Sequence, residues 1–176
     1  MKFETAAERE FPEIQKFYWD VIDGIHAEYP DNPKLGWGKG VYPTDAYLKE
    51  ALSAGELYRL TEGDRLLACV ILNNRANEGY AGCPWSLECA PQDILYVHTL
   101  AVHPSLQKKG IGKIVVCEII SLARRLGKKA IRLDVLSACR EAERLYVACG
   151  FRFVIAKDMY YEDTGLVEYK MYELNL

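Results

Sequence analysis

The sequence predicts an α/β (α+β) fold, with helices over a mixed sheet, and three observations lead to this prediction. Apolar runs with a period of two alternate with helical patterns over most of the chain. The run 93–102 is apolar on both faces, which is typical of a central strand covered on each side. The length of 176 residues suits one domain with its own core. We therefore expect a single domain over 1–176.

The first half of the chain is predicted to contain two helices and three strands. In order, the expected elements are a strand at 2–6, helices at 7–29 and 45–54, and strands at 57–61 and 66–73. The first helix follows from apolar residues at spacings of three and four. Thr44 suits the N-cap of the second helix, and Gly55 lies just past its end. Residues 62–65, Glu-Gly-Asp-Arg, have the composition of a hairpin turn.

Two irregular segments are rich in proline, glycine and aromatic residues. The segment 29–44 contains Trp37, and the segment 74–92 contains Trp85. Loops of this length often have a function. Trp37 is equally consistent with a wall of a binding pocket and with a plug for the core of the protein, and the segment 74–92 is the second candidate for the lining of a substrate pocket.

In the second half, the expected elements are a strand at 93–102, a helix at 113–126, a strand at 130–136, a helix at 139–149, and strands at 151–156 and 169–174, with a connecting loop at 158–168. Period two places Ile94, Tyr96, His98, Leu100 and Val102 on one face of the first of these strands. A histidine in a strand that is buried on both faces must be hydrogen-bonded or have a function.

The turn Gln107-Lys108-Lys109-Gly110-Ile111-Gly112 lies between this strand and the following helix. Glycine lets a backbone approach an anion closely, and the N–H groups at a helix start point outward at that anion. The lysines add positive charge. The turn therefore indicates a phosphate site. The nucleotide-binding patterns Gly-x-x-x-x-Gly-Lys-Ser/Thr and Gly-x-Gly-x-x-Gly are absent from the sequence.

Composition narrows the class of protein further. A net charge of -3 argues against a nucleic-acid or anionic-membrane partner, and no apolar run reaches the ~18 residues of a membrane span. The N-terminal residues do not resemble a signal peptide, so we expect a cytoplasmic protein whose six cysteines are reduced and mostly buried. With three histidines and no Cys-x-x-Cys pair, we expect no metal site.

Three motifs in order resemble the GCN5-related N-acetyltransferase (GNAT) superfamily. They are Leu100-Ala101-Val102-His103-Pro104, Gln107-Lys108-Lys109-Gly110-Ile111-Gly112, and Leu145-Tyr146-Val147-Ala148-Cys149-Gly150-Phe151. The close match spans about a third of the chain. The resemblance implies a mixed, mostly antiparallel sheet of six to seven strands with about four helices. It also implies an acetyl-CoA-dependent transferase that acts in a ternary complex.

The resemblance assigns the donor site to two neighbouring stretches. The residues expected to hold the pyrophosphate of acetyl-CoA are Gln107, Lys108, Lys109, Gly110, Ile111, Gly112 and Lys113. The backbone of Leu100, Ala101 and Val102 is expected to pair with the pantetheine arm, and the N–H of Leu100 to polarise the thioester carbonyl. The resemblance also assigns Cys139 to the donor site, at the position where many relatives have an asparagine that contacts the pantetheine.

The resemblance also assigns catalytic roles. Tyr146 is the expected general acid, which protonates the departing thiolate. His98 is the expected base, because the arylalkylamine branch has a histidine at this position, and Tyr96 is expected to share a water with it. A core packing role is the alternative for both Tyr146 and His98.

We expect the acceptor to be a primary amine of a small molecule. A protein N-terminal or lysine acetyltransferase is one alternative, and the stretch Asp158-Met159-Tyr160-Tyr161 is similar to a loop of ribosomal-protein acetylating relatives. A non-catalytic acyl-CoA-binding module is another. Homodimerisation through the C-terminal strands is compatible with the sequence.

Overall fold

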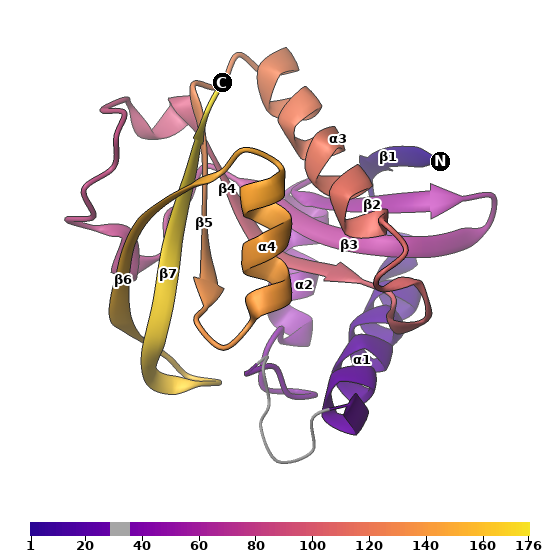
Figure 1. The fold of residues 1–176 in the computed structure, drawn as a ribbon. Coiled ribbons are helices and arrows are strands. Elements are labelled where there is room, and N and C mark those ends of the chain that lie inside the picture. The colour runs from indigo at the N-terminus through magenta and orange to yellow at the C-terminus, as the bar shows by residue number, and fades with distance from the viewer. Residues whose placement is uncertain (29–35) are drawn as a thin grey trace. The chain divides into compact units, whose positions relative to one another are not determined.

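A computed structural model describes residues 1–28 and 36–176 of the chain and confirms the predicted sheet with helices (Figure 1). The strand order of the seven-stranded sheet is β1-β2-β3-β4-β5-β7-β6. Strands β4 and β5 are parallel, whereas the β1/β2, β2/β3, β5/β7 and β6/β7 pairs are antiparallel. The elements are β1 (Lys2–Thr5), α1 (Phe11–Glu28), α2 (Asp45–Ser53), β2 (Leu57–Glu62), β3 (Arg65–Asn73), β4 (Ile94–Val102), α3 (Ile111–Arg125), β5 (Ala130–Leu136), α4 (Arg140–Ala148), β6 (Arg152–Tyr161) and β7 (Gly165–Asn175).

The chain divides into two compact units, each made of two stretches of sequence. The first unit comprises residues 1–72 and 98–115, and the second comprises residues 73–97 and 116–176. The boundaries fall inside β4 and inside α3. Because both units are discontinuous in sequence, the expected single domain stays a prediction.

In the first unit, helices α1 and α2 pack on strands β2 and β3. The shared core contains apolar side chains of all four elements, among them Phe17, Leu48, Leu57 and Ile71. Thr44 caps α2 as predicted, because its hydroxyl accepts a hydrogen bond from the N–H of Tyr47 at 3.1 Å.

The tryptophan of the first irregular segment, Trp37, lies against this same core. Trp37 packs against it, with its ring centroid 5.9 Å from that of Tyr18. This contact favours the interpretation of Trp37 as a plug for the core. Residues 29–35 of the segment lie outside the described residues.

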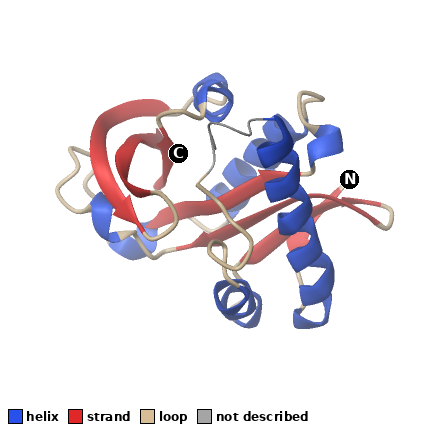
Figure 2. Ribbon diagram, turned by 90° about the horizontal axis from the view of Figure 1, so that it is seen from below, coloured by secondary structure: helices blue, strands red, loops and turns tan. Residues whose placement is uncertain are grey.

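In the second unit, β6 and β7 form a long antiparallel hairpin beside β5. Figure 2 shows the strands that lead to the C-terminus curling through a wide arc. A second core lies on this curved surface and contains Tyr80, Ile94, Tyr96, Met159, Tyr169 and Met171. Tyr80 belongs to the 74–92 segment, so this segment covers one face of the sheet.

Several details of the sequence prediction were wrong. Residues 158–168 are not a loop, because β6 continues to Tyr161 and β7 begins at Gly165. Their alternating exposure resembles that of a polar segment, which hides the strand pattern. Leu126, the last residue of the predicted helix at 113–126, is exposed and lies just beyond the end of α3 at Arg125. Of the six free cysteines only Cys69 is buried, so most are not core residues.

Within the described residues, no helix combines the length and the apolar character needed to cross a membrane.

Candidate functional site

The predicted phosphate turn lies in the first unit between β4 and α3. The backbone is left-handed at Lys108 (φ 61°) and at Gly110 (φ 84°), and α3 begins immediately afterwards at Ile111. The side-chain amide of Gln107 donates to the carbonyl oxygen of Val102 at 3.4 Å, which ties the turn back to the end of β4. Left-handed residues of this kind are typical of anion-binding nests, in which successive backbone N–H groups point to one side.

The residues of this turn fit a phosphate group. A side chain on Gly110 would meet no heavy atom within 4 Å, so the protein does not fill the space beside the turn. The first N–H groups of α3 have no acceptor within the helix, and the helix dipole favours an anion there. The side chains of Lys109 and Lys113 are exposed and add positive charge. Lys108 forms an exposed ion pair with Glu28, at 3.3 Å.

Strand β4 changes its conformation just before the residues predicted to hold the pantetheine arm. Its parallel ladder with β5 runs from Ile94 to Tyr96. Thr99 then has a left-handed φ of 48°, which is rare for a β-branched residue. The hydroxyl of Tyr18 donates to the carbonyl oxygen of Thr99 at 2.9 Å and holds this bend in place. A bend of this kind breaks the period-two alternation predicted for 94–102.

The predicted catalytic residues of β4 lie before the bend. Tyr96 and His98 occupy alternate positions of the strand, and both are buried. Ile94 and Tyr96 share the core of the second unit, as period two predicts. His98 is assigned to the first unit.

Tyr146 lies on α4 in the second unit and is 7% exposed. Its ring packs edge-on against Phe151 with the centroids 5.4 Å apart. Burial is the main cause of a strongly raised pKa for its hydroxyl, and the nearby side chains of Cys139 and Asp134 raise that pKa further. The phenol therefore holds its proton at neutral pH, as a general acid must. Cys139 is the residue just before α4, so Cys139 and Tyr146 lie within electrostatic reach of one another.

A polar cluster beside Tyr96 was not predicted from the sequence. The hydroxyl of Tyr80 donates to the Asp134 carboxylate at 2.6 Å, and the side-chain amide of Asn77 lies 3.5 Å from the same oxygen. The Tyr80 and Tyr96 rings meet edge-on at 5.4 Å. The available signal in the sequence was the pair of charges, Arg132 and Asp134, that interrupts the apolar strand at 130–136.

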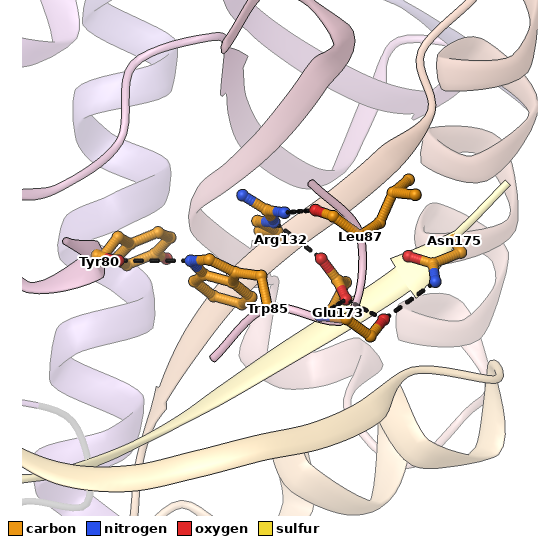
Figure 3. A network of polar contacts seen from close by, with 7 residues as sticks. Tyr80, Trp85, Leu87, Arg132, Glu173 and Asn175 are labelled. Atoms are coloured by element: carbon orange, nitrogen blue, oxygen red, sulfur yellow. Dashed lines mark hydrogen bonds and ion pairs between the residues drawn. The ribbon is translucent and has the colours of Figure 1, made fainter. Parts of the chain in front are cut away.

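A second polar network, drawn in Figure 3, fixes part of the 74–92 segment to the sheet. Arg132 on β5 pairs with Glu173 on β7 at 2.9 Å, and both side chains are buried. The Arg132 guanidinium also donates to the carbonyl oxygen of Leu87 at 2.6 Å and lies over the Trp85 ring at 4.4 Å. Trp85 is therefore held in the packing of the second unit, and its indole N–H donates to the carbonyl oxygen of Tyr80.

The structure thus places the predicted residues in two sets. The first unit contains His98, Leu100, Ala101, Val102, Gln107, Lys108, Lys109, Gly110, Ile111, Gly112 and Lys113. The second unit contains Tyr96, Cys139 and Tyr146. Within the first set, the turn contacts the end of β4 directly through Gln107.

Solved structures share this fold over nearly the whole chain. The Salmonella typhimurium protein yncA, whose structure contains its cofactor acetyl-CoA, matches with a TM-score of 0.70 and 17% identity, over 100% of this chain and 94% of that chain. The ribosomal-protein-alanine N-acetyltransferase of Brucella melitensis matches with a TM-score of 0.70 and 13% identity, over 100% of both chains. At these identities the likeness shows a common fold.

Sequence comparison identifies the family. An uncharacterized N-acetyltransferase of Bacillus subtilis (strain 168), YvbK, is 33% identical over 110 residues, which are 62% of this chain and 61% of that protein. The chain therefore matches less than two thirds of the length of this relative. The model of the acetyltransferase (GNAT) family matches residues 13–151, which include β4, the glycine turn and α4. The chain belongs to the acetyltransferase (GNAT) family.

Proposed function

We propose that the protein is an N-acetyltransferase that moves the acetyl group of acetyl-CoA to a primary amine of a small molecule. The transfer is direct, with both substrates bound together. The observation that carries the proposal is the left-handed turn at Lys108 and Gly110 at the start of α3, within the span of the family match. The acetyl-CoA in the yncA structure, which has the same fold, supports the choice of donor.

The glycine turn binds the donor through its pyrophosphate. The residues assigned to this contact are the seven from Gln107 to Lys113, with N–H groups from the turn and from the first turn of α3. The ammonium groups of Lys109 and Lys113 act as point charges on the phosphates. Lys108 joins them when it leaves Glu28, an exposed ion pair of small energy.

The end of β4 orients the donor. When bound, acetyl-CoA supplies an acetyl group activated as a thioester. The backbone of Leu100, Ala101 and Val102 follows the left-handed residue Thr99, so it departs from the regular pleat of the strand. These backbone groups hold the pantetheine arm, and the Leu100 N–H polarises the carbonyl where negative charge develops.

Two protons must move during the reaction. An alkylamine has a pKa near ~10.4 and is mostly ammonium at neutral pH, so it must lose a proton before it reacts. His98 accepts that proton, directly or through a water that Tyr96 also contacts. The Tyr146 hydroxyl gives a proton to the departing thiolate, which is consistent with its raised pKa and its burial.

Cys139 replaces the asparagine found at this position in many relatives. Its thiol lies at the start of α4, near enough to Tyr146 to raise the pKa of the phenol. We assign Cys139 to the wall of the donor site rather than to a covalent step.

The fold alone does not separate a small-molecule acceptor from a protein acceptor. The Brucella melitensis protein of the same fold is a ribosomal-protein-alanine N-acetyltransferase, which favours a protein N-terminus as the second candidate. The segment that was similar to a loop of such relatives is the end of β6 here, not a loop. We therefore keep the small-molecule amine as the first candidate. The non-catalytic module, the cytoplasmic location and the homodimer stay predictions.

Two measurements test the proposal. Isothermal titration calorimetry with CoA and with acetyl-CoA is expected to show one site per chain. A thiol assay for CoA release is then expected to respond to small amines, including polyamines, aminoglycosides and arylalkylamines, more strongly than to peptides with free N-termini. Lack of binding in the calorimeter would overturn the donor assignment, and a response to peptides alone would replace the first candidate by the second.

A further inference from the structure

One charged side chain of the second unit has no part in the chemistry proposed above. Asp134 lies on β5, where Leu133 and Val135 point to the opposite face and are buried. Arg132 and Asp134 therefore project from the same face of the strand, toward the core that contains Tyr80 and Tyr96.

The two charges of this face have different partners. Arg132 lies opposite Glu173 in the β5/β7 register and forms a buried ion pair with it. Asp134 lies opposite Met171, two positions further along the two strands. Within residues 1–28 and 36–176, no lysine, arginine or histidine forms an ion pair with Asp134. Among the described residues, Glu173 thus neutralises the buried charge of Arg132, whereas the half-buried carboxylate of Asp134 has no cation paired with it.

Neutral donors nevertheless fix the Asp134 carboxylate in place. Tyr80 donates to it at 2.6 Å, and Asn77, which lies 3.5 Å from it, makes its shorter hydrogen bond to the hydroxyl of Tyr161, at 2.9 Å. The ring of Tyr96 packs edge-on against that of Tyr80. The result is an oriented carboxylate among tyrosine rings, a setting in which an organic cation gains from the charge and from the ring faces.

Retaining this charge is unfavourable for the folded protein alone. Burial raises the pKa of Asp134, although the hydrogen bonds from Tyr80 and Asn77 lower it. An asparagine would accept the same hydrogen bond from Tyr80 without the cost of a partly buried charge. The negative charge of Asp134 is therefore suited to a positive partner, which a bound acceptor can supply.

We propose that Asp134 binds a second cationic group of the acceptor, which makes the preferred acceptor a diamine or polyamine rather than a monoamine. This inference rests on the proposed function. Asp134 binds the amine that does not react, rather than the amine that receives the acetyl group, for the following physical reason. A carboxylate beside the reacting nitrogen would stabilise its ammonium form, and a carboxyl group is a far weaker base than an alkylamine with a pKa near ~10.4.

The position of Asp134 supports this assignment. Its charge is one of the causes that raise the pKa of Tyr146, the proposed general acid, so the two groups lie within electrostatic reach. An ammonium group bound at Asp134 would cancel that negative charge. It would thereby ease proton donation by Tyr146 only when the correct acceptor is present.

The test compares matched acceptors that differ in one charge. The probes are 1,3- to 1,8-diaminoalkanes, each paired with the n-alkylamine that has the same number of carbon atoms. The wild-type protein is expected to show a kcat/KM at least about tenfold higher for the diamine at its best length. In Asp134→Asn, the ratio of kcat/KM for the diamine to kcat/KM for the matched monoamine is expected to fall to near one. Asp158→Asn, the same substitution at an exposed position of β6, is the control and should keep the wild-type ratio.

Calorimetry with acetyl-CoA shows whether Asp134→Asn is folded. If it is not, Tyr80→Phe provides the second variant, because it keeps the charge and removes its orienting donor. This variant is expected to raise KM for the diamine more than for the monoamine. The inference is overturned if the wild type prefers no diamine of any length, or if Asp134→Asn lowers kcat/KM equally for both members of a pair. If no amine releases CoA at all, the proposed function fails instead.

Discussion

At the scale of single residues, Tyr146 gives the most direct test of the proposed chemistry. Tyr146→Phe removes one hydroxyl from a buried ring and leaves its contact with Phe151. We expect kcat to fall by about 10²–10⁴-fold, the usual contribution of a positioned acid, with nearly unchanged affinity for acetyl-CoA. Steady-state kinetics and calorimetry on the same preparation check this. Wild-type kcat in the variant would remove Tyr146 from the mechanism.

Asp134 gives a prediction about stability. Burial raises its pKa in the folded state, so the unfolded chain ionises first as the pH rises. The wild type therefore loses stability as the pH rises from the unfolded pKa, near ~3.9, through the raised folded value. Asp134→Asn lacks this loss, and we expect its Tm at pH 7 to be roughly 2–4 °C higher, equivalent to about 1 kcal/mol.

Thermal unfolding of both proteins at pH 7 and near pH 4 measures this effect. The difference in Tm should shrink at the lower pH, because near the unfolded pKa of ~3.9 the aspartate of the unfolded chain is only about half ionised. A Tm difference that is the same at both pH values would mean that charge is not its cause.

At this scale, the sequence predicts a residue's conformation where a local motif determines the backbone. It does not predict which side chains meet where those contacts depend on the tertiary fold. The glycine turn and the Thr44 cap were predictable because their conformations depend on neighbouring residues. The partners of Asp134 were not, because Tyr80 and Asn77 are more than fifty residues away in the sequence. The left-handed φ of Thr99 has no local signal, since threonine disfavours it.

At the scale of elements, helix α1 packs closely on the turn that follows β4. A Cβ on Gly24 would lie 2.7 Å and 2.9 Å from two ring carbons of Pro104. Helix propensity alone predicts that Gly24→Ala stabilises the protein by ~1 kcal/mol. We expect the contact to dominate and to lower the free energy of unfolding by about 1–3 kcal/mol.

Chemical denaturation of a double-mutant cycle measures this balance. Pro104→Ala removes part of the ring, so Gly24→Ala should be less destabilising in that background than in the wild type. Equal effects in both backgrounds would show that Pro104 is not the obstacle.

The pairing of β5 with β7 depends on one buried ion pair. Glu173→Gln would leave the Arg132 guanidinium buried with its charge uncompensated, and we expect a loss of about 3–5 kcal/mol in the free energy of unfolding. Glu168→Gln, at an exposed position of the same strand, is the matched control and should change stability by less than about 0.5 kcal/mol. Urea denaturation compares the two, and similar midpoints would contradict a structural role for the pair.

Elements with strong periodicity were predicted closely from the sequence. The strand at 130–136 matches β5 at both ends, and α2 differs from its prediction by one residue. The β6–β7 hairpin was missed at 158–168, because all of its residues except the buried Met159 are exposed or half-buried, and apolar and polar residues do not alternate regularly there. The residues of β6 pair with those of β7 in a register that the local sequence does not encode.

At the scale of the whole molecule, the two compact units share elements of the chain. Strand β4 and helix α3 each contribute residues to both units. Unfolding one unit alone would require β4 and α3 to unravel in the middle, which breaks the hydrogen bonds of regular structure. We therefore propose that 1–176 folds as a single cooperative domain.

Differential scanning calorimetry tests this proposal. We expect one transition in which the calorimetric and van't Hoff enthalpies agree. Two resolved transitions, or a van't Hoff enthalpy well below the calorimetric one, would show that the units unfold separately.

The family could be predicted from the sequence because its motifs are local, whereas the acceptor could not. The donor contacts that we propose come mainly from backbone groups of one contiguous stretch, 100–113, which contains the two glycines of the turn. Residues that we assign to acceptor binding come from β5 and the 74–92 segment. Only the fold brings these distant segments together.

The exposure of the cysteines has a practical consequence for measuring the donor. Cys117 is exposed, whereas the other five thiols are buried or half-buried. It lies on α3, six residues after the first residue of the helix, or about 9 Å along the axis at 1.5 Å per residue. A maleimide fluorophore should therefore attach preferentially at Cys117. The wild-type sequence thus carries its own attachment point for an optical reporter of nucleotide-thioester binding, suitable for stopped-flow work without engineered cysteines.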